Sequence, residues 1–402
     1  MAGGRDDEGG GLDTGAAKPE QAASNVMKTT PENQAATFRN QDQVWPHRVI
    51  RRGQTVRALP PHHRPLAHQA YEVGDAMIGL DDFMARRRTA GFLILKNGEI
   101  ALERYGMGSG PESRWASFSI AKSMTATLVG AALHDGAIGS LDEACGLYVP
   151  QMRGSAYEDV TLRNLLRMAS GVIWDEGDKS DGRDLRRLGQ AMGSRRPGAI
   201  LDLLRTLPRA APQGAVFNYS TGESVLLGAV VAAATGRPLA DYFAQTVWGP
   251  AGMEADGLWQ LESEDGLELG GMGVSARLRD VGRFGLLVLE DGEAFDGRRV
   301  LPSGWRDLAG QPDCAATAFG RLMAGSPAGY GYHWWSLPGA PFADGLHAGA
   351  FLALGAFGQR IYLNPTEQAV AVIQSAWRQP HDSEAEAETV ALLRTLIRAL
   401  RP

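Results

Sequence analysis

The sequence predicts a mixed α/β (α+β) fold, in which an antiparallel sheet is flanked by helices. A large helical subdomain is inserted between an N-terminal hairpin and the C-terminal strands. Three observations support this prediction. Two β-rich runs surround Asn97-Gly98, residues 119–291 show mostly helical spacing of apolar residues, and strand-like alternation returns after Gln311. Strand-rich segments on both sides of a helical one indicate a sheet that carries helices.

The N-terminal segment, residues 1–45, is rich in Gly, Ala, Asp, Glu, Gln and Thr, so we expect a disordered tail. Residues 46–402 then form one domain, whose first segment, 46–65, is rich in Pro, Arg and His and is expected to lie as an extended arm on the domain. The sheet part is expected at about 85–118 and 300–402. The helical part is expected at about 119–299.

Individual elements follow from local patterns. Asn97-Gly98 between two β-rich runs, within residues 92–105, is a strong hairpin signal. Apolar spacing predicts helices at 161–168, 185–193, 200–207, 223–235, 239–247, 276–290 and 384–400. Alternation predicts strands at 330–336, 359–363 and 369–375, with Asn364-Pro365 marking the turn between the last two.

Composition and charge exclude several classes of protein. The 402 residues are 44% hydrophobic and 21% charged, as in ordinary globular proteins, and the formal net charge of −6 argues against a nucleic-acid surface. No apolar run reaches the length that spans a bilayer, and the N-terminal residues lack the apolar core of a secretion signal. We therefore expect a cytoplasmic protein without nucleic-acid or membrane partners.

Metal and cofactor sites are not expected. Cys145 and Cys314 lie far apart and have no zinc-type spacing. His62, His63 and His68 are clustered, but no carboxylate or cysteine lies at a ligand-like interval in the sequence, which favours surface histidines.

The strongest chemical signal is Ser119 and Lys122. Residues three apart share one face of a helix, and the apolar positions Ile120, Met124 and Leu128 indicate that this helix is buried. Burial of Lys122 disfavours its charged form, which lowers its pKa and lets the amine accept a proton from a serine hydroxyl. The spacing alone is common, and a capping serine beside a solvated lysine is the alternative.

A serine–lysine pair also needs a second proton carrier and donors for an oxyanion. Tyr219 lies within residues 216–222, a loop that precedes a predicted helix. A tyrosine in a loop is usually a packing residue. Its position after the Ser-x-x-Lys helix and before another helix start favours a catalytic role here.

Five segments from about residue 90 onward occur in an order that resembles a known superfamily. They are Ser117–Ser123, Leu165–Val172, the Tyr-Ser-x loop at Tyr219, Gly273–Asp280 and Gly355–Pro365. The chain resembles the serine β-lactamases and penicillin-binding proteins, specifically the class C-like branch that contains the 6-aminohexanoate-dimer hydrolases. The resemblance implies a β-lactamase/DD-peptidase-like fold.

The resemblance also implies roles for individual residues. Ser119 would be the acylated nucleophile, Lys122 its base and Tyr219 the group that passes a proton to the leaving group. The backbone N–H groups of Ser119 and Ala356 would form the oxyanion hole, where a helix N-terminus offers an unpaired amide. Candidate substrate-binding residues are Trp174, Glu268 and Phe357, although a core tryptophan and a solvated glutamate are alternatives for the first two.

Two departures from the family pattern bear on the substrate. Thr221 stands where β-lactamases commonly have asparagine, and no Lys-Thr-Gly follows in the third motif region, where Ala356, Phe357 and Gly358 occur instead. The cation that would pair with a β-lactam carboxylate is therefore missing from its usual place. The chain is expected to be a metal-free serine hydrolase that cleaves a small amide or ester through an acyl-enzyme on Ser119.

Several alternatives remain open at this point. They are a carboxylesterase, DD-peptidase or β-lactamase of the same fold, and a binding module without catalysis. The natural substrate and a homodimeric state are also left open. An α/β-hydrolase is excluded because the chain contains no Gly-x-Ser-x-Gly.

Overall fold

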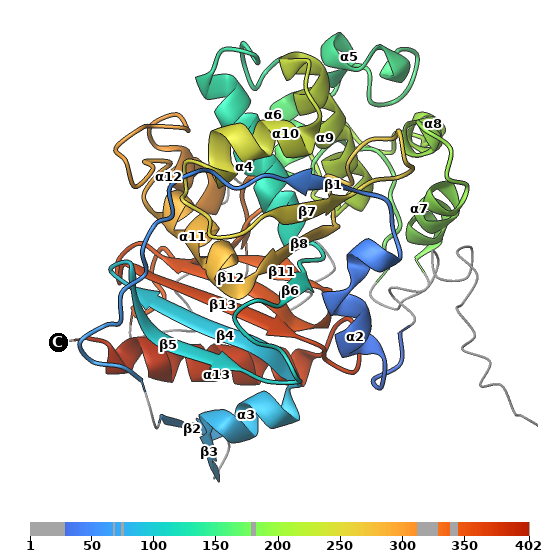
Figure 1. Cartoon of the computed structure of the whole chain (residues 1–402). Helices are drawn as coiled ribbons and strands as arrows, with labels where there is room; N and C mark the ends of the chain where they lie inside the picture. The colour runs from blue at the N-terminus through green and yellow to red at the C-terminus, as the bar shows by residue number, and fades with distance from the viewer. Residues whose placement is uncertain are drawn as a thin grey trace, which may run out of the picture.

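The computed structural model describes residues 29–66, 69–73, 76–177, 182–311, 329–337 and 345–401. Its central element is an antiparallel sheet of seven strands in the order β5-β4-β13-β12-β11-β10-β9, of which β5, β4, β13, β12 and β11 are labelled in Figure 1. The strands are β4 Thr89–Lys96, β5 Glu99–Tyr105, β9 Gly329–Tyr330, β10 Trp335–Ser336, β11 Phe351–Gly355, β12 Gln359–Asn364 and β13 Ala369–Ser375.

The hairpin expected at Asn97-Gly98 is confirmed as β4 and β5. Asn97 and Gly98 have positive φ angles of 52° and 79°, the backbone conformation of a two-residue hairpin turn, and Lys96 pairs with Glu99. On its other side β4 pairs with β13, so that Leu95 lies opposite Val370. The N-terminal hairpin and the C-terminal strands therefore form one sheet, which confirms the predicted fold class.

The C-terminal strands follow the prediction with one exception. β12 and β13 lie where alternation placed them, but the single strand expected over 330–336 is wrong. β9 and β10 pair with each other, and the chain turns between them, where His333 has a φ of 59°. A run of aromatic residues matched the strand pattern, although the backbone reverses within it.

Helices cover both faces of this sheet (Figure 1). α13, Ser383–Ala399, lies on one face, where Leu392 and Leu396 share a hydrophobic cluster with Phe92 and Ile94 of β4. On the opposite face α11, Leu278–Leu289, packs so closely that a Cβ on Gly282 would lie 2.6 Å from the Leu93 side chain. Successive residues of β4 thus face opposite helices, and this explains why the whole strand is apolar.

The helical part lies on the α11 side of the sheet. Its helices are α4 Ile120–His134, α5 Cys145–Tyr148, α6 Leu162–Leu166, α7 Arg183–Gly193, α8 Ala199–Arg205, α9 Thr221–Thr235, α10 Leu239–Phe243 and α12 Trp305–Gly310. A π-helical turn, Ala244–Trp248, extends α10. α4 and α9 pack against each other and are buried along most of their length, which fits their apolar sequences.

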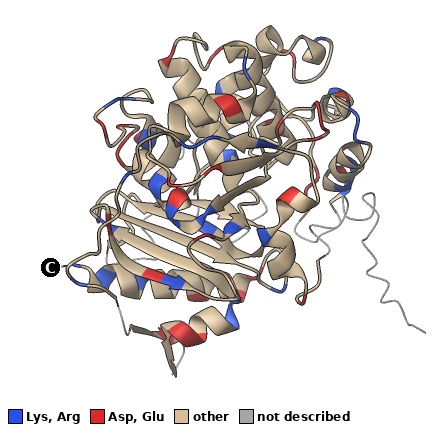
Figure 2. Ribbon diagram, in the orientation of Figure 1, with Lys and Arg blue, Asp and Glu red and all other residues tan. Residues whose placement is uncertain are grey.

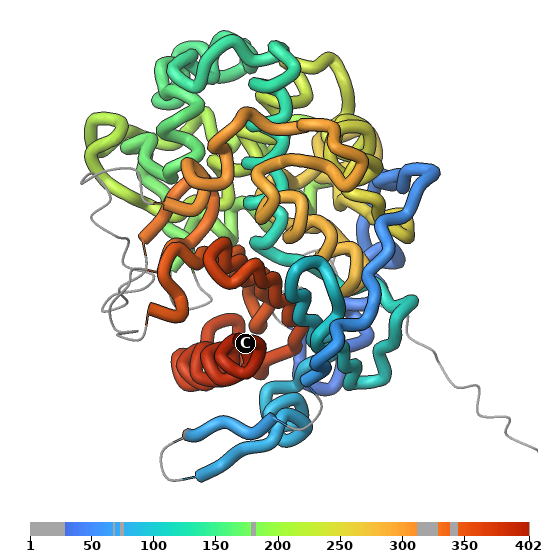
Figure 3. The backbone as a smooth tube through the Cα atoms, turned by 90° about the vertical axis from the view of Figure 1, so that its left-hand side faces the viewer, coloured from blue at the N-terminus to red at the C-terminus, as the bar shows by residue number. Residues whose placement is uncertain are grey.

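A second sheet takes two of its four strands, β7 and β8, from the segment expected to be helical. Its order is β1-β7-β8-β6, from β1 His47–Ile50, β6 Arg114–Ala116, β7 Gly257–Gln260 and β8 Val274–Arg277. These strands are short, and apart from the neighbours β7 and β8 their partners are far away in the sequence, so no local pattern revealed them. A separate hairpin, β2 Ala70–Val73 and β3 Ala76–Gly79, projects from the body beside α3, Leu80–Arg86 (Figure 3).

Part of the predicted disordered tail is folded. Within residues 1–45 the structure describes 29–45, where α2 spans Gln34–Arg39 and a 3₁₀ turn follows at Gln41–Gln43. Phe38 is fully buried and contacts Phe118 and Phe357, with ring centroids 4.8 and 5.3 Å away. The prediction of disorder is therefore wrong for 34–43, because polar composition hid one anchoring aromatic side chain. Residues 1–28 lie outside the described part.

Lys and Arg residues are interspersed with Asp and Glu residues along the ribbon in Figure 2. Within the described residues, no helix combines the length and apolarity that crossing a membrane requires.

Candidate active site

Ser119 is the residue that caps the N-terminus of α4. The preceding Phe118 has a φ of 48°, a left-handed conformation that is rare for an aromatic residue and often marks functional sites. Ser119 remains partly exposed between buried neighbours. Its hydroxyl is therefore presented to the outside at the positive end of a long buried helix.

Lys122 is directed back toward Ser119 from the first turn of α4. Its side chain is only 1% exposed, and Nζ lies 2.9 Å from Ser119 Oγ, 2.9 Å from Thr221 Oγ1 and 3.0 Å from the carbonyl oxygen of Gly271. Gly271 must be glycine for this approach, since a Cβ there would lie 2.7 Å from Thr221 Cγ2. The start of α4, the start of α9 and the segment at Gly271 therefore meet at the amine of Lys122.

Burial changes the acidity of this amine. Loss of hydration disfavours the ammonium form and lowers the pKa of Lys122 to about 8, while the nearby Glu176 acts in the opposite direction. A substantial fraction of Lys122 is then neutral slightly above neutral pH. It can take the proton of Ser119, as the sequence predicted for a buried lysine.

Tyr219 lies in the loop before α9, and its ring faces the amine of Lys122. Nζ of Lys122 is 4.8 Å from the centre of its ring, and Trp335 stacks on the ring with centroids 5.6 Å apart. Burial and the negative charge of Glu176 raise the pKa of Tyr219 above its ordinary value, against the hydrogen bond with Ser119 that lowers it. The phenol therefore stays protonated at neutral pH and is suited to donating a proton.

The segment expected to supply the second oxyanion donor lies beside the nucleophile. Gly355, at the end of β11, passes so close to Ser117 that a Cβ would be 2.6 Å from the Ser117 carbonyl oxygen. Phe357 packs on Phe118 with ring centroids 5.4 Å apart. Ser119 is the N-cap of α4 and Ala356 is the first residue of the 3₁₀ turn Ala356–Gly358, positions whose backbone N–H groups have no acceptor within their own helix.

The site and fold agree with comparisons to known proteins. The sequence profile of the family described as Beta-lactamase matches residues 80–395, well over half of the chain. The chain belongs to the β-lactamase family.

Comparisons with individual proteins agree with this family assignment. A 6-aminohexanoate-dimer hydrolase of Paenarthrobacter ureafaciens is 27% identical over 298 residues, which cover 73% of this chain and 74% of that protein. A Bacillus anthracis protein provisionally described as a 6-aminohexanoate-dimer hydrolase has the same fold, with a TM-score of 0.79, 22% identity and coverage of 93% and 97% of the two chains. This member of the β-lactamase family is a serine hydrolase.

More distant structures share the fold alone. EstCE1, described as a hydrolase with promiscuous acyltransferase activity, aligns with a TM-score of 0.59 and 17% identity, covering 80% of this chain and 99% of its own. A penicillin-binding protein from Bacillus halodurans aligns with a TM-score of 0.59 and 18% identity over 78% of this chain and 99% of its own.

Of the candidate substrate-binding residues in this β-lactamase-family chain, Trp174 and Phe357 lie next to the catalytic cluster. Trp174 is 4% exposed. Its ring packs against Gly222 of α9, so closely that a Cβ on this glycine would lie 2.9 Å from Trp174 Cζ3. Phe357 is 1% exposed, within the aromatic cluster behind Ser119. Both side chains support the walls of the site from within. Contact with substrate remains a prediction for them.

Glu268 lies elsewhere. It is buried, pairs with Arg48 and accepts a hydrogen bond from the backbone N–H of Ala240 at the start of α10. Its described contacts connect the N-terminal arm to α10 rather than to Ser119 or Lys122. We therefore leave Glu268 out of the proposed site.

Two residues beside the candidate site had no assigned role in the sequence prediction: Thr221 contacts Lys122, and Glu176 contacts Thr221. Thr221 donates its hydroxyl hydrogen to Glu176 Oε1 at 2.6 Å, and its backbone N–H donates to Glu176 Oε2 at 2.8 Å. Thr221 could have been found from its place two residues after Tyr219. Glu176 lies on a loop 43 residues earlier than Tyr219 in the sequence, and no local pattern distinguishes it from its neighbour Asp175.

Metal-ligand geometry occurs at one place among the described residues. His62, His63 and Glu99 offer ligand atoms that all lie within 4.8 Å of one another. The expectation of surface histidines is wrong for His62, which is buried, and the strand pairing supplies the carboxylate that the sequence interval lacked. His68 and Cys314 lie outside the described residues.

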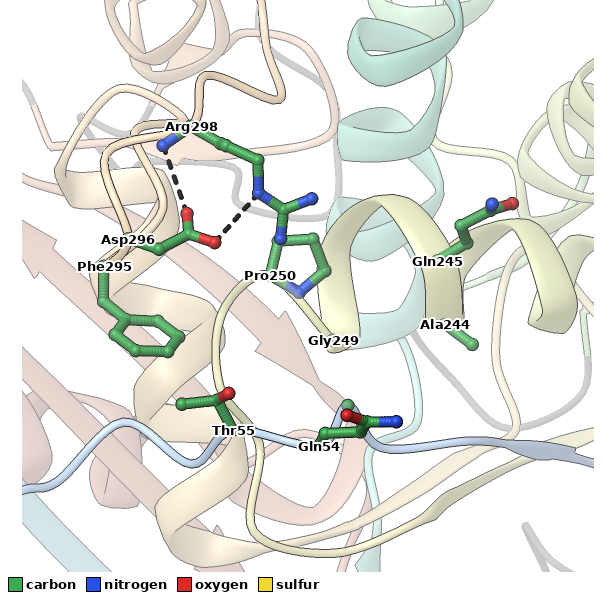
Figure 4. A pocket seen from close by; sticks show the side chains of 10 residues that line it. Gln54, Thr55, Ala244, Gln245, Gly249, Pro250, Phe295, Asp296 and Arg298 are labelled. Carbon is green, nitrogen blue, oxygen red and sulfur yellow. Dashed lines mark hydrogen bonds and ion pairs between the residues drawn. The ribbon is translucent and has the colours of Figure 1, made fainter.

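A surface hollow of about 320 Å³ lies away from the catalytic cluster (Figure 4). Its wall combines Gln54 and Thr55 of the N-terminal arm with Gly249, Pro250 and the turn at Phe295. Asp296 and Arg298 are bonded to each other there, and among the described lining residues they are the only charged ones. The hollow presents no paired nucleophile and base.

Proposed function

We propose that the protein hydrolyses a small amide through an acyl-enzyme on Ser119. The observation that carries this proposal is the buried amine of Lys122, 2.9 Å from Ser119 Oγ and with a pKa lowered to about 8. A buried lysine held on a partly exposed serine has the geometry of a nucleophile with its base. Thr221, Glu176 and Tyr219 surround the pair in a way that a purely structural lysine would not need.

Acylation follows from this arrangement. Neutral Lys122 takes the hydroxyl proton of Ser119 as Oγ forms a bond to the substrate carbonyl carbon. The backbone N–H groups of Ser119 and Ala356 stabilise the negative charge that develops on the carbonyl oxygen. The carbon–nitrogen bond then breaks, the leaving amine receives a proton from Tyr219, and Tyr219 recovers one from the ammonium of Lys122.

Deacylation uses the same groups in reverse. A water molecule attacks the ester carbonyl of the acyl-enzyme, and its proton passes to the Lys122–Tyr219 pair. The bond between the acyl carbon and Ser119 Oγ breaks, and Oγ recovers its proton. The net reaction consumes one water and releases a carboxylic acid and an amine.

Linear oligoamides are the proposed substrate class. The curated relative that covers most of this chain is named a 6-aminohexanoate-dimer hydrolase. The third motif region offers Ala356, Phe357 and Gly358 rather than a cation, so a β-lactam carboxylate has no partner in the usual place. Esters share the same acyl chemistry and are expected as secondary substrates.

An activity screen tests the proposal. Wild type, Ser119→Ala and Lys122→Met would be compared on 6-aminohexanoate oligomers, p-nitrophenyl esters and nitrocefin, with fluorophosphonate labelling followed by mass spectrometry. Methionine fills the buried volume of Lys122 without a basic group. We expect wild type to cleave the oligomers and esters, and both variants to lose labelling and turnover by at least about a hundredfold.

Ser117→Ala is the matched control. Its hydroxyl contacts only the carbonyl of Phe118 in the described part of the chain, so labelling should remain at the wild-type level. A Ser119→Ala protein that still labels would refute the mechanism. Wild-type turnover of nitrocefin without turnover of the oligomers would refute the proposed substrate class and favour a β-lactamase.

A further inference from the structure

We propose that Glu176 is a positioning residue, which directs the lone pair of Lys122 at Ser119 by fixing the direction of the hydrogen bonds between them. The inference rests on the proposed function of Ser119 and Lys122. It assigns a task to a loop carboxylate that contacts neither the nucleophile nor its base directly in the described structure.

The carboxylate of Glu176 acts only as an acceptor. Oε1 receives the hydroxyl hydrogen of Thr221 at 2.6 Å. Oε2 receives the backbone N–H of Thr221 at 2.8 Å and the indole N–H of Trp174 at 2.7 Å. Because an ionised carboxylate has no hydrogen to give, Thr221 must donate its only hydroxyl hydrogen to Glu176. Thr221 Oγ1 can then only accept from Lys122.

This constraint determines how neutral Lys122 is oriented. A neutral amine has two hydrogens and one lone pair, and Nζ has three partners within 3.0 Å. The carbonyl oxygen of Gly271 can only accept, so it takes one hydrogen. Thr221 Oγ1 takes the other because its own hydrogen is engaged. The lone pair is left facing Ser119 Oγ, where a base needs it.

The charge of Glu176 acts in addition to its geometry. Titratable groups around Lys122 include Tyr219 beside it and His333 in the β9–β10 turn, and Glu223 lies in the first turn of α9, the helix that begins at Thr221. At neutral pH these three are largely neutral, since burial raises the pKa of Tyr219, raises that of Glu223 to about 8 and lowers that of His333 to about 3. Among the described residues, Glu176 is therefore a charged neighbour that favours the ammonium form of Lys122.

The variant Glu176→Gln should reverse the hydrogen bond. Two N–H donors face the Oε2 position, so the amide oxygen of glutamine belongs there, and its NH₂ group faces Thr221 Oγ1. The Thr221 hydroxyl then receives a hydrogen bond from the amide and turns its own hydrogen to the lone pair of Lys122. The lone pair is no longer available to Ser119.

The test measures the rate of fluorophosphonate labelling against pH. For Glu176→Gln we expect the plateau rate to fall roughly tenfold to a hundredfold, the range for one hydrogen bond to a charged or catalytic group. The acid limb should also move to lower pH, because loss of the carboxylate lowers the pKa of Lys122 further. Asp175→Asn is the control, since Asp175 is an exposed carboxylate on the same loop whose side chain accepts from Arg183 N. Its profile should match wild type.

A double variant separates orientation from a general structural effect. In Thr221→Val there is no hydroxyl to turn toward Lys122, so adding Glu176→Gln should not lower the plateau rate further. Thr221→Ser keeps the hydroxyl and should label within about threefold of wild type, while Thr221→Val should label more slowly. These two variants test the hydroxyl step even if Glu176→Gln fails to fold.

The outcomes distinguish this inference from the proposed function. A wild-type protein that no fluorophosphonate labels would refute the proposed function itself. Normal wild-type labelling with an unshifted profile for Glu176→Gln would overturn the role of Glu176 alone. An equal loss from Glu176→Gln in the threonine and valine backgrounds would also overturn it.

Discussion

At the scale of single residues, burial shifts the pKa values of the proposed base and the proposed acid in opposite directions. Desolvation lowers the pKa of Lys122 and raises that of Tyr219, so the two groups are neutral together over a range of pH near and above neutrality. A neutral amine accepts a proton and a neutral phenol donates one. In the proposed mechanism Lys122 therefore deprotonates Ser119, and Tyr219 protonates the leaving group.

The variant Tyr219→Phe should therefore distinguish amides from activated esters. An amine leaving group needs a proton, so turnover of an oligoamide should fall by about a hundredfold to ten-thousandfold. The p-nitrophenolate group leaves without one, and acylation by p-nitrophenyl esters should fall by less than about tenfold. The burst of p-nitrophenol and the steady-state amide rate measure the two effects.

Tyr330→Phe is the control for loss of a phenol near the site. Tyr330 is buried and packs edge-on against Tyr219, with ring centroids 6.1 Å apart. The Tyr330→Phe variant should retain both the turnover of the oligoamide and the acylation by p-nitrophenyl esters. Equal losses for amide and ester in Tyr219→Phe would contradict the role of Tyr219 as proton donor.

At the scale of elements, the first turn of α9 supports the catalytic cluster from behind. Ser220 caps the helix by accepting from the backbone N–H of Glu223, and Thr221 follows at the first helical position. Glu223 is fully buried, accepts a hydrogen bond from Ser170 Oγ at 2.6 Å, and has its pKa raised to about 8 by burial. The helix that places Thr221 therefore contains a carboxyl group that is protonated when the protein is folded at neutral pH.

Glu223→Gln should make the protein more stable, increasingly so as the pH rises from about 5 to 8. The native state holds a proton on Glu223 up to about pH 8, whereas the unfolded chain loses it near pH 4.5. Wild-type stability therefore falls across this interval and is constant above it with respect to this group. Glutamine mimics the protonated acid without that penalty. Thermal unfolding at pH 5, 6.5 and 8 measures the difference.

Glu158→Gln serves as the comparison, because Glu158 is exposed and its carboxylate accepts only from Gly154 N in the described part of the chain. Its effect on the unfolding temperature should be small and nearly independent of pH. A Glu223→Gln protein whose stability tracks wild type at every pH would show that Glu223 is ionised in the folded state.

At the scale of the whole molecule, three distant segments form one aromatic cluster behind the nucleophile. Phe38 comes from α2, Phe118 precedes Ser119, and Phe357 follows the proposed oxyanion residue Ala356. Phe118 and Phe357 both have left-handed backbones, with φ angles of 48° and 62°. The packing of Phe38 on both rings stabilises two strained residues that flank the proposed oxyanion hole.

Phe38→Ala should reduce both stability and activity. Removal of a fully buried phenylalanine costs about 3–5 kcal/mol of unfolding free energy. We also expect the fluorophosphonate labelling rate to fall at temperatures where the variant is still fully folded, because the backbone around Ser119 and Ala356 is less constrained. Chemical denaturation and labelling of the folded variant measure the two effects separately.

Thr37→Ala provides the matched control in α2, since within the described part of the chain its hydroxyl bonds only to the carbonyl of Asn33, the N-cap of the same helix. It should change stability by less than about 1 kcal/mol and leave labelling unchanged. Full activity of a folded but destabilised Phe38→Ala protein would limit the role of α2 to stability.

Local patterns predicted the parts of this protein whose energetics are local. The turn at Asn97-Gly98 is determined by two residues that tolerate positive φ angles, and α9 and α11 by apolar spacing within one segment. The pairing of Ser119 with Lys122 follows from helical geometry alone, because residues three apart share a face. These features could be predicted from the sequence because no distant residue is needed to form them.

Other features depend on contacts between segments that are remote in the sequence. The sheet β1-β7-β8-β6, the folding of α2 around Phe38, and the exclusion of Glu268 from the site each require a partner that no local pattern indicates. The same holds for Glu176, which is adjacent in the sequence to the exposed Asp175. Helical spacing in the sequence indicated the candidate nucleophile and its proposed base. The carboxylate that contacts Thr221 beside them emerges only from the tertiary structure, because a charged group acts only on what folding brings within hydrogen-bonding distance.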